Sequence, residues 1–194
     1  MPKVNEIKKT MKEQGIPAEQ MTQIEFPKPK GNQPEEVLSL INQIDELLTV
    51  EQRLAVMEEQ GCCKDEKVTA PFLAFATKYA DKTVEEKSSL FEEIKSGHKP
   101  SHRLNPDGTL LIYWDGWDYE KSTCVCRVIK RLYKNRGSSF NVSKTFCGCC
   151  AGHVRNTFQC ALDVKLHLKE IVSSPISSDG KEQCEFLFYI ESSV

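Results

Sequence analysis

The chain has 194 residues, a formal net charge of −2 and 28% charged residues. This length predicts one domain of ordinary size with a sizeable core. The balanced charge gives no sign of a nucleic-acid or membrane partner. No apolar run approaches the roughly 20 residues that a membrane helix needs, and residues 1–15 lack the apolar stretch of a secretory signal. We therefore expect a cytoplasmic protein that binds neither nucleic acid nor membrane.

Residues 1–33 are predicted to form an N-terminal arm and linker, outside a single domain over residues 34–194. Apolar residues at helical spacing are Val4, Ile7 and Met11. Gly15 stops that helix, and the proline-containing stretch 26–31 indicates an extended linker. The arm packs on the domain, reaches a partner subunit or moves freely, and the sequence does not choose among these.

Residues 34–96 read as a helical half. Pro34 opens a helix, and Thr49 caps the next one, with Gln52 at the capping-box position and Gly61 as the stop. Further short amphipathic helices are predicted over residues 68–80 and 84–95, the latter capped by Thr83.

The pattern changes after Gly97. A loop over residues 98–108 ends in the turn formers Asn105-Pro106-Asp107-Gly108, which predict a strand directly after them. The segments expected next are a strand over 109–114, a strand or strand leading into a short helix over 122–129, a basic loop over 130–139 and a short strand over 141–146.

The C-terminal segment alternates between apolar and polar residues. The alternation covers residues 164–172 and, after a turn, residues 184–191. This pattern predicts an antiparallel hairpin with one buried face. Cys184 shares the buried face with the phenylalanines, whereas His167 lies on the polar face and is discounted as a ligand. The fold class expected is α+β, a helical N-terminal half packed on a C-terminal antiparallel sheet.

Nine cysteines are many for such a chain, and an odd number in a reducing compartment does not suggest a disulfide framework. Cys147, Cys149 and Cys150 head a predicted helix. The first turn of a helix has unpaired N–H groups and a partial positive charge, which favour thiolates. His153 is spaced to share a helix face with Cys149 or Cys150. We assign Cys160, farther along the helix, to packing.

A metal site is the first interpretation of this pattern. Two Cys-x-Cys units occur, and zinc prefers four tetrahedral ligands, for which thiolates are well suited. The candidate ligands are Cys124, Cys126, Cys147, Cys149, Cys150 and Cys184, with His153 as a substitute. Because the spacing differs from the Cys-x-x-Cys of zinc ribbons, metal-free reactive thiols and simple packing stay open as alternatives.

A nucleophile is the second interpretation. Cys150, or Cys149, with His153 one turn away has the elements of a Cys–His pair. Thiol exchange between Cys62 or Cys63 and the later cysteines is a further alternative, since adjacent cysteines form a strained disulfide with each other.

The cysteine-headed helix carries glycine in its first turn, in Cys149-Cys150-Ala151-Gly152. A strand follows, then a serine-containing turn and the motif Gly180-x-x-x-Cys184-x-Phe186. This run resembles the C-terminal half of the 4-vinyl reductase (V4R)-like small-molecule-binding domains. It is similar to a cysteine-rich bacterial group labelled L-2-amino-thiazoline-4-carboxylic acid hydrolase-like, which Gly61-Cys62-Cys63 and Cys124-x-Cys126 also resemble.

The resemblance implies an α+β domain, often a homodimer, whose helices and sheet enclose a ligand pocket. In V4R sensor domains a zinc lies near that pocket, held by cysteines at the helix start, in the hairpin and before the last strand. Carried over, these positions are Cys149 or Cys150, Ser174 and Cys184. The serine is a departure, which Cys124, Cys126 or Cys147 would have to compensate.

We therefore predict a protein that binds a small organic ligand beside a cysteine-rich zinc site. The first alternative is a hydrolase of a small cyclic C–N substrate that uses a cysteine thiolate or a metal-bound water. The second is a structural or partner-binding protein without either chemistry.

Overall fold

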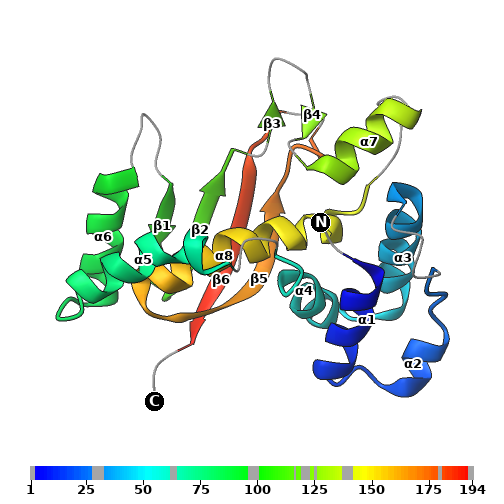
Figure 1. Cartoon of the computed structure of the whole chain (residues 1–194), viewed down its shortest axis with the longest axis horizontal. Helices are drawn as coiled ribbons and strands as arrows, with labels where there is room; N and C mark the ends of the chain where they lie inside the picture. The colour runs from blue at the N-terminus through cyan, green and yellow to red at the C-terminus, as the bar shows by residue number, and fades with distance from the viewer. Residues whose placement is uncertain are drawn as a thin grey trace.

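A computed structural model describes residues 3–27, 33–61, 65–95, 101–115, 117–118, 123–124, 126–136, 142–178 and 181–191. Helices fill the N-terminal half, and every strand comes from the C-terminal half (Figure 1), so the predicted α+β class is confirmed. The helices are α1 (Val4–Glu13), α2 (Ala18–Thr22), α3 (Pro34–Leu47), α4 (Val50–Glu58), α5 (Glu66–Lys78), α6 (Val84–Lys95), α7 (Arg127–Arg136), the 3₁₀-helix η1 (Lys144–Cys147) and α8 (Gly148–Leu162). The strands are β1 (His102–Leu104), β2 (Thr109–Trp114), β3 (Trp117–Asp118), β4 (Thr123–Cys124), β5 (Lys165–Ser173) and β6 (Cys184–Glu191).

The main sheet has four antiparallel strands in the order β1-β2-β6-β5, and β3 and β4 form a separate pair. Along β6, Cys184, Phe186 and Phe188 are buried, whereas Tyr189 is half-exposed. The predicted hairpin with one buried face is therefore confirmed. Helix α8 contacts β5 and packs its apolar side on the buried face of the sheet (Figure 1).

The predicted helix caps are confirmed by their hydrogen bonds. The Thr49 hydroxyl accepts a 3.3 Å bond from the Gln52 N–H, and the Gln52 side chain accepts a 2.9 Å bond from the Thr49 N–H. The Thr83 hydroxyl accepts from the Glu86 N–H in the same way at the start of α6. These reciprocal bonds satisfy N–H groups that a helix start leaves unpaired.

Three expectations for the middle of the chain are wrong. The basic segment 130–139 was expected to be a loop but is helical as far as Arg136, because Val128, Ile129 and Leu132 share one buried side of α7. The segment 141–146 forms no strand in its described part, where η1 begins, and the stretch 98–108 contains strand β1.

The described part of the N-terminal arm packs on the rest of the molecule. Val4, Ile7 and Met11 of α1 are buried. The Gln60 side chain, just after α4, donates a 3.0 Å hydrogen bond to the Thr10 hydroxyl. The sequence left three alternatives for the arm, and the structure selects packing for α1. Most of the predicted linker, residues 28–32, lies outside the described residues.

Buried apolar side chains form two clusters. The first core is mainly aliphatic and is supplied by α1, α3, α4 and α7. The second core is rich in phenylalanine and is supplied by α5, α6, α8 and the main sheet. Helices α4 and α8 contribute residues to both, so their contact connects the two cores.

The backbones of α4 and α8 meet without side chains between them. A Cβ atom on Gly152 would collide with the Glu58 carbonyl oxygen, and one on Gly61 would lie 2.5 Å from the Gly152 carbonyl carbon. Arg155 of α8 bonds Glu58 and Glu59 across this contact, with N–O distances of 2.6 Å in both pairs. Glu58 also accepts a 2.6 Å hydrogen bond from the Leu168 N–H of β5. Polar and glycine residues thus hold the two cores together.

Within the described residues, every helix is too short or too polar to cross a lipid bilayer.

Candidate functional site

The cysteines predicted to form a site occupy four places in the fold. Cys124 ends β4, and Cys126 immediately precedes α7. Cys147, Cys149 and Cys150 lie where η1 passes into α8, and Cys184 begins β6. All of them are free thiols. Cys62 and Cys63, named above for thiol exchange, lie outside the described residues.

These cysteines lie where the two cores meet. Cys124 and Cys149 belong to the first core, whereas Cys147 and Cys184 belong to the second. Cys150 packs against both cores. We call the set Cys124, Cys126, Cys147, Cys149, Cys150 and Cys184 the cysteine cluster.

Electrostatic interactions connect the members of the cysteine cluster. Burial raises the pKa of the Cys124 thiol to about 11, and the neighbouring Cys126 and Cys149 add to the rise. Burial likewise raises the pKa of Cys147 well above its ordinary value, with Cys184 as the next cause. One thiol can shift the pKa of another in this way because buried charges at short distance interact strongly in a medium of low dielectric constant. Residues 124 and 184 are thus brought to one region around the start of α8.

Cys149 and Cys150 are adjacent thiols that shift each other's pKa. The interaction with Cys150 lowers the pKa of Cys149 against the opposing effect of burial. The same interaction, followed by burial, raises the pKa of Cys150 well above its ordinary value. Position in the first turn of α8 adds to this preference for a Cys149 thiolate, because the helix start favours negative charge.

Ser174 belongs to the same site. The resemblance placed this serine where V4R domains have a hairpin cysteine. Its side chain is completely buried, its hydroxyl lies 3.2 Å from the Ser177 hydroxyl, and its proximity to Cys147 lowers the pKa of that thiol against the effect of burial. Ser174 therefore lies beside Cys147, one of the residues named as a compensation for the missing cysteine.

His153 lies one turn into α8, against the aromatic ring of Trp114 on β2, with ring centroids 5.9 Å apart. Trp114 pairs with Cys184 across β2 and β6. The imidazole is thus in contact with the sheet beside the last member of the cysteine cluster. Cys160, assigned above to packing, lies farther along α8, and burial alone raises its pKa.

The chemistry of the cysteine cluster suits a soft cation, since buried thiolates are good ligands of zinc. Among the described His, Cys, Asp and Glu side chains, no three are already placed to hold one metal ion. The thiol donors fit zinc, but zinc binding would require their side chains to turn toward one another.

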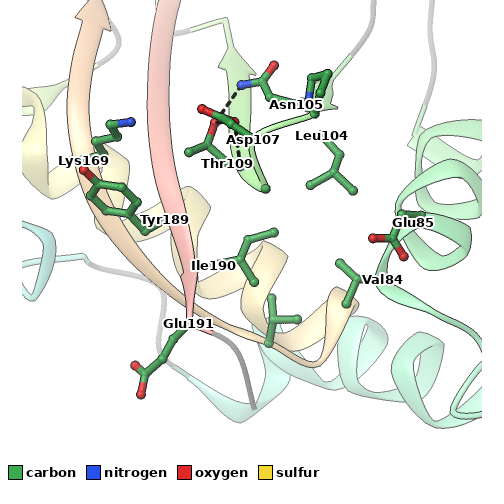
Figure 2. Close-up of a pocket in the computed structure, with 13 residues that line it drawn as sticks. Val84, Glu85, Leu104, Asn105, Asp107, Thr109, Lys169, Tyr189, Ile190 and Glu191 are labelled. Carbon is green, nitrogen blue, oxygen red and sulfur yellow. Dashed lines mark hydrogen bonds between the residues drawn. The ribbon is translucent and has the colours of Figure 1, made fainter. Parts of the chain in front are cut away.

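A groove of about 760 Å³ lies at the other end of the sheet. Figure 2 shows Lys169 and Tyr189 on one side of it and Val84 and Glu85 of α6 on the other. Tyr189 pairs with Thr109 at the end of β6 opposite to Cys184. Five residues of extended strand separate the two positions, a distance of about 17 Å. This groove is therefore not beside the cysteine cluster.

A buried polar cluster was missed by the sequence reasoning. His102 of β1 lies 2.8 Å from the Ser88 hydroxyl through Nε2 and 2.8 Å from the Glu92 carboxylate through Nδ1. The Ser101 hydroxyl donates a 2.6 Å bond to the same carboxylate. This cluster attaches the edge strand β1 to α6. No motif spacing indicated this cluster, because Ser88 and Glu92 lie in a predicted helix whereas Ser101 and His102 lie in a segment expected to be a loop.

Comparison of the chain with family models, curated proteins and solved structures finds no match. The resemblance to V4R-like domains stays a prediction.

Proposed function

We propose that the protein binds zinc through the cysteine cluster and that it also binds a small organic ligand. The observation that carries the zinc proposal is the gathering of six thiols from four separate places in the fold. A core built for packing alone does not need thiols that raise one another's pKa. Zinc would neutralise these thiolates and join the two cores. A reducing, cytoplasmic location is part of the proposal, because the ligands must be reduced thiols.

Metal analysis of protein purified without added metal tests this proposal. We expect close to stoichiometric zinc, and slow reaction of the cluster thiols with iodoacetamide until a chelator is added. Cys147→Ser and Cys149→Ser are expected to lose most of the zinc. Cys160→Ser is the matched control, since Cys160 lies on the same helix outside the cysteine cluster. Zinc near zero with all thiols reactive contradicts the proposal, as does equal zinc loss in the control.

A nucleophilic Cys149 is the second candidate, and the lowered pKa of this thiol beside Cys150 in the first turn of α8 favours it. The reaction class would be hydrolysis of a small cyclic C–N substrate. In metal-free protein, iodoacetamide would then label Cys149 much faster than the other thiols, and Cys150→Ala would change that rate. Uniform labelling that only a chelator releases favours zinc instead. If the protein is instead structural or partner-binding, we expect neither one fast-reacting thiol nor thiols that a chelator releases.

The groove of Figure 2 is one place for the small organic ligand. Its volume lies within the range of small-molecule sites. Its lining combines the polar side chains of Asn105, Asp107 and Lys169 with apolar side chains. A homodimer is also part of the proposal, and measurement of the mass in solution tests it.

A further inference from the structure

A second groove, of about 470 Å³, lies between α5 and α6, at the end of the molecule away from α1 and α3 (Figure 1). Aromatic rings form its floor. Phe75 lies between Tyr79 and Phe91, with ring centroids 4.9 and 5.2 Å away, and Phe72 meets Phe91 edge-on at 6.1 Å. Phe75 and Phe91 are buried and pack the base of the groove, whereas Phe72 and Tyr79 leave part of their rings at its surface.

The rim of this groove carries an apolar side chain exposed to solvent. Ile94 of α6 lines the groove and is 66% exposed. Exposed isoleucine beside an aromatic floor leaves apolar surface in water, and grouped apolar surface of this kind marks binding sites. The groove volume lies in the range of small-molecule sites, which argues for a compact ligand.

Among the described residues that line the groove, Lys78 carries the one charged side chain. Its Nζ lies 4.9 Å from the centre of the Tyr79 ring, at the last turn of α5. Among the residues that the structure describes, Lys78 forms no ion pair. A ligand in the groove therefore meets hydrocarbon and aromatic carbon over most of its surface and an ammonium group at one end.

We propose that the groove between α5 and α6 binds an apolar carboxylic acid, with its hydrocarbon body against Phe72, Tyr79 and Ile94 and its carboxylate at Lys78 Nζ. An anion is favoured because it gains a charge-assisted hydrogen bond that a neutral or cationic ligand lacks. None of the described residues that line this groove is a cysteine, so the proposal is independent of the zinc proposal.

Calorimetric titration of the full chain with decanoate tests the proposal, with decan-1-ol as the neutral probe of equal length. Decanoate is expected to bind at one site and more tightly than decanol. Lys78→Met is expected to weaken decanoate binding about tenfold, the effect of one charge-assisted bond, and to leave decanol binding nearly unchanged.

Two exposed positions provide a matched pair of variants. Ile94→Asp puts a carboxylate into the groove and is expected to abolish decanoate binding. Leu73→Asp makes the same chemical change on α5 at a residue that is 50% exposed and outside the lining, and it is expected to bind as the unchanged chain does. Circular dichroism checks that both variants fold.

Several outcomes would overturn the proposal. One is equal affinity for decanoate and decanol, or equal loss of both in Lys78→Met. Another is a wild-type chain that binds neither probe. A third is a concentration-dependent dimer that both aspartate variants dissociate, because the exposed apolar surface would then be an interface between two copies of the chain.

Discussion

The two cores of this protein differ in the side chains that fill them. The first is filled by aliphatic side chains from four helices, with Phe146 as its one fully buried aromatic residue among those described. The second surrounds its sheet with phenylalanine, including Phe158, Phe186 and Phe188. Where the two cores meet, the junction contains glycines, an arginine with two glutamates and the cysteine cluster, together with Ile176, which packs against both cores.

This difference shows where chemistry can be placed in a small domain. Apolar side chains inside each core are interchangeable to a degree, because packing tolerates swaps that conserve volume. The junction is more demanding, since buried charged and polar groups need particular partners. Changes at the junction should therefore uncouple the two cores, whereas changes inside one core should leave the other in place.

The largest effect is expected for Arg155→Leu, which leaves Glu58 buried without its cation. Removing one partner of a buried ion pair costs about 3–5 kcal/mol, and protonation of Glu58 brings the expected loss to the lower end. Urea unfolding measures it. Arg53→Leu is the control, because the Arg53–Asp45 pair is partly exposed and is expected to contribute less than about 1 kcal/mol. Equal losses would mean that the Arg155 pair is no more important than a surface pair.

Gly152→Ala is expected to come next. The added methyl group meets the backbone of α4, which cannot move without separating the helices. Overpacking of this kind costs about 1–3 kcal/mol. Cys160→Ala, on the same helix, controls for a change in α8 itself. A thermal unfolding temperature of Gly152→Ala equal to that of the unchanged chain would show that α4 and α8 are not in fixed contact.

Thr49→Ala is expected to have a smaller effect, a loss of about 1 kcal/mol, because it removes the hydroxyl that accepts the Gln52 N–H at the start of α4. Since α4 contributes to both cores, chemical unfolding should show one shifted transition with an unchanged slope. Two separated transitions would instead indicate that the cores unfold independently.

The smallest effect is expected for Glu92, which lies on α6 next to Phe91 of the second core. Burial raises its pKa, but the Ser101 hydrogen bonds and His102 more than offset this, so the pKa lies below the ordinary value of 4.5. The carboxylate therefore stabilises the fold above pH 4.5, and this contribution is lost as the pH falls through the lowered pKa.

Glu92→Gln should lower stability at pH 7 and weaken the loss seen on acidification. Urea midpoints at pH 7, 5, 4 and 3 measure both effects relative to the exposed control Glu19→Gln. An acid dependence identical in the two variants would contradict the predicted role of Glu92.

Local signals were sufficient for much of the fold. The caps at Thr49 and Thr83 and the alternation around Phe186 each depend on neighbours in sequence, so their elements were predicted with the correct type. The secondary-structure prediction was wrong where tertiary burial of a few apolar residues outweighed a mainly polar local composition. The basic residues of α7 indicated a loop, but tertiary contacts bury Val128 and Leu132 on one side of the helix.

The sequence by itself determined that thiols head a helix, that Cys184 faces inward and that an antiparallel hairpin ends the fold, because periodicity and helix-start chemistry are local. Only the tertiary structure decided that Cys124 and Cys184 lie near the same helix start, that Ser174 lies beside Cys147, and that His102 joins Glu92. Such contacts depend on how α4, α8 and the sheet pack in three dimensions. Residue spacing along the chain predicts local elements, but it does not predict which distant elements pack against each other.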